Sequence, residues 1–296
     1  MTLWTRILNW YDGHGRELPW RRTRDPYRIL VSEIMLQQTQ VSRGLIFYDR
    51  WLAQFPDWNT LAEASNADVI RAWAGLGYNR RPLMLRDIAR QIIDRGVPAS
   101  EEDWQTLKGI GPYTAAAIAA FALHQRTIPV DTNIRRVLGR LLFGIPYSQP
   151  DVDDRIRKSI DRILPSRGRF YDVPQALFDL AAMHCAKVPN CADCPMRQVC
   201  PASTKFTSGR VRVPKQMIRK PLESRHRNKR YPDRIYRGRI LKLVRDNERV
   251  LIASIGQMID VSYDCARDYE WILAMAGRLK RDGMIRINKE TIRLAK

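Results

Sequence analysis

The sequence has no long apolar run. No window of the 296 residues reaches the roughly eighteen consecutive apolar residues that a membrane-spanning helix needs. The first twenty residues place Arg6, Asp12 and Glu17 among their apolar positions, a mixture that secretory signals do not have. We therefore expect neither a membrane span nor an export signal, and we expect a cytoplasmic protein.

Acidic residues are scarce relative to basic ones. The chain has 51 Lys and Arg against 31 Asp and Glu, so its formal net charge is +20 and its pI is near 10.2. Such a chain is attracted to dense polyanions, and nucleic acid is the leading candidate partner. Because 45% of the residues are hydrophobic and 8 are Trp, the chain can build apolar cores. This composition excludes a disordered, histone-like tail.

Cysteine is also scarce, and its odd number and distribution exclude a disulfide framework. There are 5 cysteines. Four of them lie close together in one polar loop: Cys185, Cys191, Cys194 and Cys200. Four thiolates in such a loop can hold either zinc or an iron–sulfur cluster. Zinc sites usually use two close Cys pairs, whereas this loop has a single Cys-x2-Cys pair with an outer cysteine on each side, which favours a cluster.

Strand-like alternation is nearly absent before Cys185, where apolar residues recur with helical spacing. A basic, proline-containing segment between Lys205 and Arg239 then predicts a linker. Beyond it, the spacing predicts helices at 237–245, 250–258 and 268–280 and a β-hairpin at 283–294 that turns at Asn288 and Lys289. Three helices and a two-stranded ribbon resemble a winged helix, which binds DNA through its third helix or binds another protein.

A short glycine motif follows a polar helix-like segment at 101–107. Gly109 and Gly111 precede Pro112, Tyr113 and an alanine-rich helix. Glycines free this turn so that its N–H groups can approach a phosphate oxygen at a helix N-terminus. The motif indicates a helix-hairpin-helix, which positions a protein on DNA without reading sequence. An ordinary helix–helix turn is the alternative that the motif alone leaves open.

Two acidic residues stand out from their surroundings. Glu33 lies in the segment 29–36, where six of eight residues are apolar. Burial disfavours a charged carboxylate, so we expect a raised pKa that lets Glu33 act as a general acid. Asp131 follows the apolar Ile128-Pro129-Val130, and its place before a helix also suits an ordinary N-cap.

Taken together, these motifs resemble the helix-hairpin-helix, Gly/Pro-Asp (HhH-GPD) superfamily of DNA glycosylases, and most closely the MutY-type adenine glycosylases. The resemblance covers residues 1 to about 205. Its motifs occur in family order: Leu18-Pro19-Trp20-Arg21, the stretch 31–41, Gly75-Leu76-Gly77-Tyr78, the hairpin with Tyr113, Val130-Asp131-Thr132-Asn133 and the cysteine loop.

The resemblance implies a mostly α fold of two helical lobes. It places the glycosylase domain at 1–205, with a six-helix lobe at 25–133 and a cluster-bearing lobe formed by 1–24 and 134–205. A basic linker at 206–233 and a winged-helix-like domain at 234–296 complete the predicted organisation. It also implies a 4Fe-4S cofactor on Cys185, Cys191, Cys194 and Cys200, a double-stranded DNA partner, and a monomer associated with a prokaryotic nucleoid.

The resemblance also implies roles for individual residues. Glu33 corresponds to the general acid that protonates the flipped adenine, and Asp131 to the carboxylate that stabilises the positive charge on the deoxyribose. The supporting catalytic residues are Tyr113 and Asn133. The residues expected to contact the base or the DNA are Gln38, Tyr78, Gln175, Arg21, Gly109 and Gly111. Because Tyr113 stands where strand-cleaving relatives carry a Schiff-base lysine, the resemblance implies a monofunctional glycosylase.

Three features depart from the family pattern. The first gap in the cysteine loop has five residues where the family commonly has six. The run Asn79-Arg80-Arg81 is similar to thymine mismatch glycosylases, and the helical C-terminal segment replaces the MutT-like domain that inspects 8-oxoguanine. Three hypotheses follow: an adenine glycosylase acting opposite G or 8-oxoguanine, a thymine or uracil glycosylase acting opposite G, and a non-catalytic iron–sulfur regulator that binds DNA.

Overall fold

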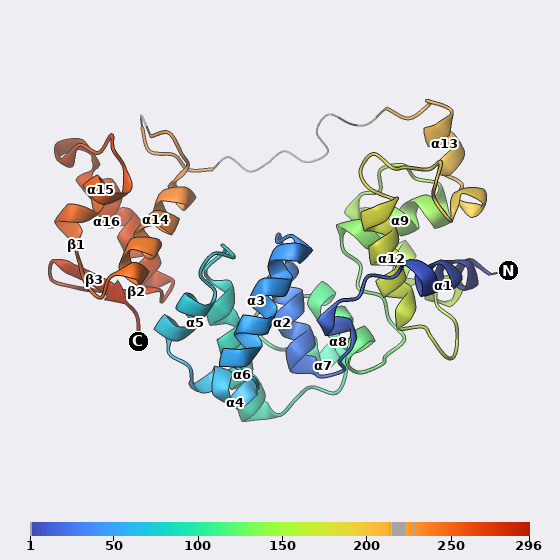
Figure 1. Cartoon of the computed structure of the whole chain (residues 1–296), viewed down its shortest axis with the longest axis horizontal. Coiled ribbons are helices and arrows are strands. Elements are labelled where there is room, and N and C mark those ends of the chain that lie inside the picture. The colour runs from blue at the N-terminus through green and yellow to red at the C-terminus, as the bar shows by residue number, and fades with distance from the viewer. Residues whose placement is uncertain (1, 213, 215–222, 228) are drawn as a thin grey trace. The chain divides into compact units, whose positions relative to one another are not determined.

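The computed structural model describes residues 2–212, 214, 223–227 and 229–296. Helices make up most of the regular structure, and no strand occurs within the described stretch 2–212 (Figure 1). The predicted mostly helical fold class is confirmed at this level. The chain divides into two compact units, residues 1–33 with 98–217 and residues 34–97 with 218–296. The domain boundaries expected from the sequence stay a prediction.

The first unit is built from helices and short 3-10 turns. They are α1 (Leu3–His14), η1 (Pro19–Arg21), most of α2 (Pro26–Leu36), α7 (Glu101–Gln105), α8 (Pro112–Phe121), α9 (Thr132–Phe143), η2 (Pro150–Val152), α10 (Asp153–Arg157), α11 (Ile160–Ile163), α12 (Asp172–Met183), η3 (Arg197–Val199) and α13 (Ser203–Thr207).

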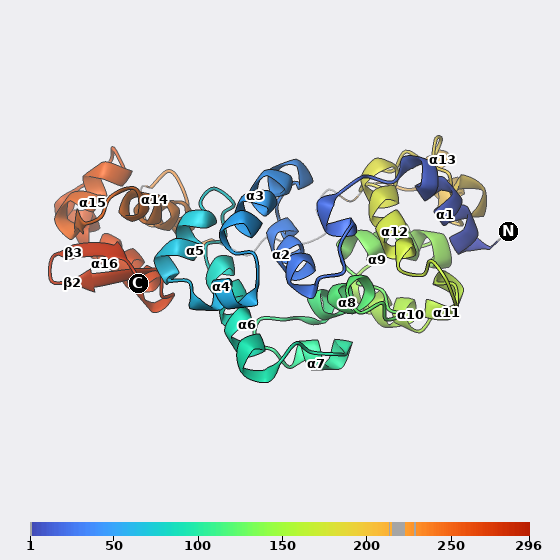
Figure 2. The same ribbon diagram turned by 60° about the horizontal axis from the view of Figure 1, so that its bottom comes forward.

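One part of this unit has its core where α12 packs against α1 and α9 (Figure 2). Ile7, Val137 and Leu177 are at most 1% exposed there. Helix α9 ends at Gly144, whose φ of +62° is a left-handed conformation that glycine adopts without steric cost. The packing fixes the start of α9, which Asp131 caps, and helix α12, which carries Gln175 in its first turn and precedes Cys185.

Helix α8 is also buried, and it packs against α7. Its residues from Thr114 to Ala120 are all buried. Small side chains along a helix allow close approach of neighbouring elements, which explains the run of alanines. The connection from α7 contains Gly109 at a φ of +106°, where a residue with a Cβ is strained.

The second unit begins with the last turn of α2 and continues through α3 (Val41–Gln54), α4 (Trp58–Glu63), α5 (Asn66–Ala72) and α6 (Arg81–Arg95). Trp51 and Trp73 anchor its interior, with ring centroids 5.3 Å apart in an edge-to-face arrangement that aromatic rings favour. Both tryptophans are at most 1% exposed.

The C-terminal segment contains α14 (Asp233–Asp246), β1 (Val250–Leu251), α15 (Ile252–Ile259), α16 (Cys265–Arg281), β2 (Ile285–Asn288) and β3 (Thr291–Leu294). The strands form an antiparallel sheet in the order β1-β3-β2. The predicted hairpin is confirmed, but its turn is at Lys289 and Glu290 and not at Asn288 and Lys289, because Asn288 pairs with Thr291. The predicted helix at 250–258 is wrong in its first two residues, because Val250 and Leu251 pair with Ile292 and Thr291 instead.

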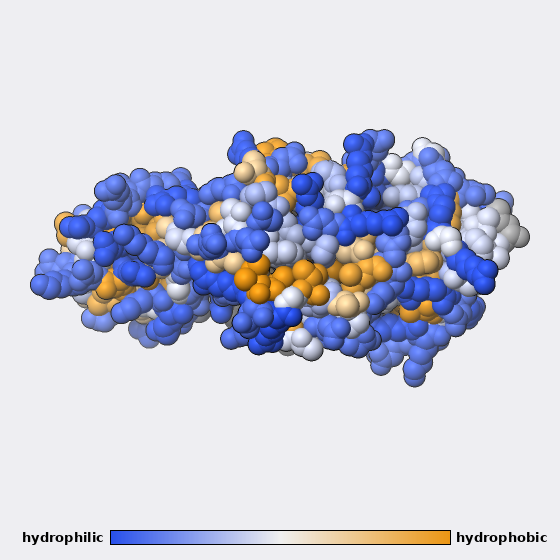
Figure 3. All heavy atoms as spheres, turned by 90° about the horizontal axis from the view of Figure 1, so that it is seen from below, coloured by the Kyte–Doolittle hydropathy of each residue, from blue (hydrophilic) through white to orange (hydrophobic). Residues whose placement is uncertain are grey.

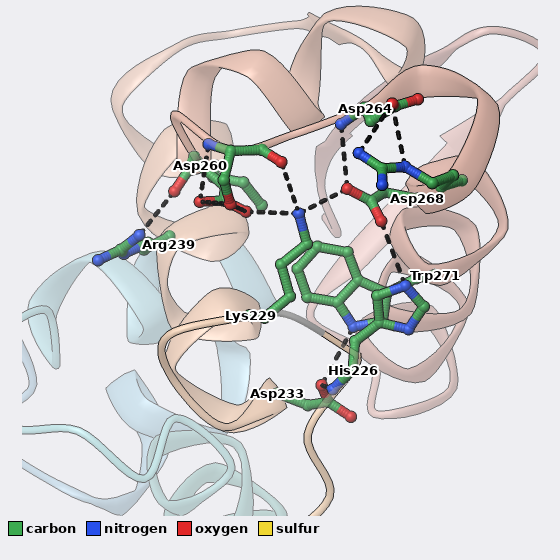
Figure 4. A network of polar contacts seen from close by, with 11 residues as sticks. His226, Lys229, Asp233, Arg239, Asp260, Asp264, Asp268 and Trp271 are labelled. Carbon is green, nitrogen blue, oxygen red and sulfur yellow. Dashed lines mark hydrogen bonds and ion pairs between the residues drawn. The ribbon is translucent and has the colours of Figure 1, made fainter.

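A buried network ties the segment before α14 to the C-terminal helices (Figure 4). The ammonium group of Lys229 lies 2.8 Å from Asp260 and 2.5 Å from Asp268. His226 stacks on Trp271 with ring centroids 5.0 Å apart and lies 3.3 Å from Asp268. Although the sequence assigns Lys229 to the basic linker, the structure buries it to 5% exposure. Residues 213, 215–222 and 228 of that linker lie outside the described residues.

Most atoms on the face drawn in Figure 3 belong to hydrophilic residues, with hydrophobic patches between them. Among the helices that the structure describes, none combines the length and the apolar character needed to cross a membrane.

Candidate active site

Glu33 and Tyr113 meet in the first unit. Glu33 lies on α2 after the buried Ile29 and Leu30, and Tyr113 lies in the first turn of α8. The hydroxyl group of Tyr113 donates a hydrogen bond of 2.8 Å to Oε2 of Glu33. Burial raises the pKa of Glu33 to about 7, although the hydrogen bond from Tyr113 opposes the rise. The raised pKa expected from the sequence is confirmed, so Glu33 carries a proton in a large share of molecules at neutral pH.

Asp131 is held by the helix that it caps. Its Oδ1 accepts hydrogen bonds from the backbone N–H groups of Asn133 at 2.8 Å and Ile134 at 2.7 Å. Its Oδ2 accepts a third, of 2.7 Å, from the side-chain amide of Asn133. The N-cap that the sequence allows is therefore present, and it fixes the orientation of the carboxylate.

The two acids and the tyrosine share one electrostatic environment. The charge of Asp131 contributes to the raised pKa of Glu33. Burial raises the pKa of Tyr113 well above its usual value, and the charges of Glu33 and Asp131 raise it further. The structure thus brings together all four predicted catalytic residues, since Asn133 is hydrogen-bonded to Asp131. Glu33 is a carboxyl group that holds a proton, and Asp131 is a carboxylate that N–H donors keep in place. Two acids with such different environments suit acid-assisted bond cleavage.

A chain of hydrogen bonds leads from Asp131 to the cysteine loop. Asn133 donates to Asp131, and its side-chain oxygen accepts a bond of 3.0 Å from Nη2 of Arg136. The Nε of Arg136 donates a bond of 2.6 Å to the carbonyl oxygen of Cys185. Sequence analysis gave Arg136 no role.

The four cysteines are free thiols that line one pocket. Burial raises the pKa of Cys194 to about 11, and the neighbouring Cys185, Cys200 and Cys191 raise it further. Three of the cysteines pack against the core of α1, α9 and α12, so the loop is less exposed than its polar sequence indicates. Among the described residues, no three metal-binding side chains converge on a single ion.

Arg140 secures the same loop from α9. Its side chain is buried to 1% exposure. Its guanidinium group donates to the carbonyl oxygens of Pro146 at 2.9 Å, Ala186 at 2.7 Å and Lys187 at 3.1 Å. It also lies 3.3 Å from Sγ of Cys185. Because backbone carbonyls accept these bonds, Arg140 fixes the path of the loop independently of its side chains.

Arg21 lies in a buried ion pair. Its guanidinium group donates two hydrogen bonds of 2.8 Å to Asp179, which is fully buried, and one of 3.4 Å to the carbonyl oxygen of Gln175. Burial raises the pKa of Asp179, but bonds from Arg21 and Arg16 outweigh this effect and leave the pKa below its usual value. Arg21 therefore anchors the helix that carries Gln175, and its predicted contact with DNA stays a prediction.

Sequence reasoning missed Asp179. The signal that singled out Glu33, an acid within an apolar helical stretch, is also present around Asp179 in the run from Ala176 to Ala181. The same pattern could therefore have identified Asp179 from the sequence.

Gln38 and Tyr78 belong to the second unit and are described apart from the acids. Both have left-handed backbone conformations, with φ of +60° for Gln38 and +49° for Tyr78. Such strain in residues other than glycine concentrates at functional sites. Arg81 holds both loops, because it donates to the carbonyl oxygen of Gln37 and its guanidinium carbon lies 4.3 Å from the ring centroid of Tyr78. The ring of Tyr78 is 61% exposed.

The turn before α8 leaves the first backbone N–H groups of that helix without a side-chain cap. Gly111 is the N-cap of α8 and provides no side-chain cap, and a Cβ added there would meet no atom within 4 Å. The first N–H groups of a helix lack intrahelical partners, so this uncapped terminus can accept an anion.

Comparisons with known proteins agree with this geometry. The family described as "HhH-GPD superfamily base excision DNA repair protein" matches residues 31–162. The chain is 38% identical over 252 residues to the adenine DNA glycosylase of Mycolicibacterium smegmatis, covering 81% of this chain and 80% of the relative. It is 41% identical over 197 residues to the adenine DNA glycosylase of Mycobacterium tuberculosis, covering 65% of each. The match thus spans just under two thirds of the M. tuberculosis relative.

A solved structure is also similar. A thermostable thymine-DNA glycosylase aligns with a TM-score of 0.63 and 28% sequence identity, covering 68% of this chain and 94% of that chain. The matched part of the chain therefore has the fold of that glycosylase.

Proposed function

Because the chain belongs to the HhH-GPD superfamily of base excision DNA repair proteins, we propose that it is a monofunctional glycosylase that removes adenine paired with guanine or 8-oxoguanine. The mostly helical fold agrees with this family. The observation that carries the proposal is the proton-holding Glu33, bonded to Tyr113 and influenced by Asp131.

In the proposed reaction, Glu33 gives its proton to the flipped adenine. The N-glycosidic bond then breaks, its electron pair leaves with the base, and the base departs as a neutral molecule. A pKa of about 7 places the proton where it is both present and transferable near neutral pH. The hydroxyl group of Tyr113 orients the carboxyl group through its hydrogen bond.

Asp131 faces the positive charge that develops on the deoxyribose as the bond breaks. It stabilises this charge by electrostatics or by a transient covalent bond, and water then attacks the sugar carbon to leave an abasic site. The hydrogen bonds from Asn133 and Ile134 keep the carboxylate oriented before the charge appears. Tyr113 cannot form a Schiff base with the sugar, so the strand stays intact. High-yield trapping of a protein–DNA adduct by borohydride would contradict this assignment.

Double-stranded DNA is the proposed partner. The uncapped N-terminus of α8, with Gly109 and Gly111 in the preceding turn, binds a phosphate. Gln38 and Tyr78 enter the space that the flipped base leaves, which offsets part of the cost of unstacking, on the order of a few kcal/mol. Gln175 contacts the edge of the adenine from the start of α12.

The cysteine loop fits a 4Fe-4S cluster. The four thiols line one pocket, and their spacing, with a single Cys-x2-Cys pair and an outer cysteine on each side, favours a multi-iron cluster over a single zinc. When bound, the cluster cross-links Cys185, Cys191, Cys194 and Cys200. Arg140 and Arg136 hold the backbone of this loop from α9.

The C-terminal helices and sheet form a winged-helix-like domain in this proposal. Helices α14, α15 and α16 followed by the β2–β3 hairpin support this assignment. We further propose that the protein is a cytoplasmic monomer that works at the nucleoid.

One assay tests the proposed function. Purified protein is incubated with four duplexes that carry A:8-oxoguanine, A:G, T:G or U:G, and alkali then reveals abasic sites. Cleavage of the adenine strands supports the proposal. Cleavage of none of the four would contradict it and favour a non-catalytic DNA-binding regulator.

A second candidate function is removal of thymine or uracil opposite guanine. The similarity to a thymine-DNA glycosylase structure favours it. So does the run Asn79-Arg80-Arg81, which follows Tyr78 where typical adenine glycosylases have a second tyrosine. Cleavage confined to the T:G and U:G duplexes would establish this activity and overturn adenine specificity.

A further inference from the structure

Arginines form a row on the exposed face of the C-terminal sheet. Arg286 of β2 lies directly opposite Arg293 of β3, and both side chains are exposed. Continuing the β1–β3 register by one residue beyond Val250 and Ile292 places the exposed Arg249 on the other side of Arg293. The strand order β1-β3-β2 therefore gives a row of Arg249, Arg293 and Arg286 across the sheet.

The alternation of the strands puts all three on one face. Ile285, Ile292 and Leu294 point inward and are at most 6% exposed, while Arg286 and Arg293 alternate with them. The strand spacing of roughly 4.8 Å makes the row about 10 Å long. On one DNA strand, this axial length holds about three phosphates at roughly 3.4 Å each.

Among the described residues, no Asp or Glu side chain forms an ion pair with Arg249, Arg286 or Arg293. The one hydrogen bond from the row joins Arg286 to a main-chain oxygen of Lys296 at 3.4 Å. Like charges directly opposite each other weaken a sheet. The nearby arginines at other positions differ, because Arg234, Arg245 and Arg267 are each paired with an acid.

The third helix, expected to contact DNA, is less basic where it begins. The first two turns of α16 expose Arg267, which is paired with Asp264, and Glu270. From Arg278 to Lys296, in contrast, seven basic residues stand against two acidic ones. The end of α16 and the sheet that follows it therefore carry an excess of basic residues, and the row lies within this basic part of the segment.

We infer that Arg249, Arg293 and Arg286 form a binding surface for the phosphate backbone of duplex DNA, separate from the glycosylase site. Guanidinium groups bind phosphate oxygens in a bidentate geometry, and adjacent phosphates match a row of adjacent charges. This contact reads no sequence and holds the protein on DNA through its C-terminal domain. The choice of DNA as the polyanion rests on the proposed function.

The test compares two triple variants of the full chain. One is Arg249→Gln/Arg286→Gln/Arg293→Gln, and the control is Arg234→Gln/Arg245→Gln/Arg267→Gln, which removes the same charge from paired positions. Affinity for an undamaged duplex is measured by fluorescence anisotropy between about 50 and 200 mM salt. We expect the row variant to bind roughly tenfold more weakly and to lower the slope of log affinity against log salt by about 2 to 3, with the control close to wild type.

Several outcomes decide the inference. An unchanged slope and affinity in the row variant would overturn it, and so would an equal loss in the control, since net charge alone would then explain binding. A lowered melting temperature confined to the row variant would also count against it, because relieving repulsion should not destabilise the sheet. Binding uses undamaged DNA, so a lowered slope supports the inference even if the wild type excises no base, a result that would contradict the proposed function alone.

Discussion

The acids of the candidate site and the arginines of the C-terminal sheet differ in how their charges are held. In the site and the cysteine loop beside it, hydrogen bonds fix the charged groups: Tyr113 holds Glu33, Asn133 holds Asp131, and backbone carbonyls hold Arg136 and Arg140. On the sheet, three arginines lie side by side with no acid among the described residues to neutralise them. Charged groups held by hydrogen bonds suit bond cleavage at one position. Arginines without an acidic partner suit binding to a polyanion along which the protein can slide.

The strongest way to break this comparison is to remove the fixed charge of Asp131. Asp131→Asn keeps an oxygen that can cap α9 but loses the negative charge that we propose stabilises the sugar. We expect single-turnover excision to fall by about 10³-fold, in the range seen when electrostatic groups are removed from active sites. Duplex affinity should change little. Asp154→Asn, at an exposed acid, serves as the control, and equal activity of Asp131→Asn and wild type would remove Asp131 from the mechanism.

The next largest effect concerns the fixed charge of Arg140. Arg140→Met removes a buried guanidinium group and leaves the carbonyl oxygens of Pro146, Ala186 and Lys187 without their donor. We expect the free energy of unfolding to fall by roughly 3 kcal/mol, as for other broken buried charged contacts. Chemical denaturation measures the loss, and iron content after purification reports on the loop. An unchanged midpoint would show that the loop does not depend on Arg140.

Lys229 is a charge of the C-terminal domain that, unlike the arginine row, has acidic partners. Its removal therefore tests whether pairing matters within that domain. Lys229→Met leaves Asp260 and Asp268 facing each other without the ammonium group (Figure 4). We expect about 2 kcal/mol of destabilisation of this domain, measured by hydrogen exchange in α16. The triple variant Lys229→Met/Asp260→Asn/Asp268→Asn should recover part of the loss. If the triple variant is less stable than the single one, the network does not act through charge.

The stability that this network contributes should depend on pH. Burial raises the pKa of Asp260 and of Asp268, but Lys229 outweighs it and leaves each pKa below its usual value. For such depressed groups, stability is present above the unfolded pKa and is lost as the pH falls through the folded one. The C-terminal domain of wild type should therefore lose stability in acid, and the triple variant should lose less.

The smallest effect concerns the loops of Gln38 and Tyr78. Arg81→Gln removes the contact with Gln37 and with the ring of Tyr78, so the left-handed residues are less well held. We expect single-turnover excision to slow by about fivefold, equivalent to roughly 1 kcal/mol. Arg80→Gln is the matched control, because Arg80 is 77% exposed. Equal rates for the two variants would mean that Arg81 does not position these loops.

Much of the site was predictable because its residues carry local signals. Glu33 is an acid in an apolar stretch, Asp131 occupies a helix start, and Gly109 and Gly111 mark a turn. The hydrogen bond from Tyr113 to Glu33 joins residues 80 positions apart, and no local pattern encodes it. Arg136 and Arg140 were missed because arginines on a helix usually face solvent, and only tertiary packing turns them toward carbonyls of the cysteine loop.

The helices and the hairpin of the C-terminal segment were predictable from the spacing of apolar residues. The exceptions are residues whose structure depends on strand pairing or on contacts with distant residues. Val250 and Leu251 fit a helical pattern, yet their backbone groups pair with β3. Lys229 sits in a stretch whose composition indicates a linker, and its burial depends on two aspartates more than thirty residues away. The arginine row likewise depends on register, which the sequence does not specify without the turn geometry.

The central claim is that Glu33 holds a proton near neutral pH and delivers it to the base. The most direct test is the single-turnover excision rate of adenine opposite 8-oxoguanine as a function of pH, at saturating enzyme. A group with a raised pKa is protonated below that value, so we predict a rate that is level in mild acid and falls about tenfold per pH unit above about 7. A rate that stays level or rises from pH 7 to pH 9 would contradict the account.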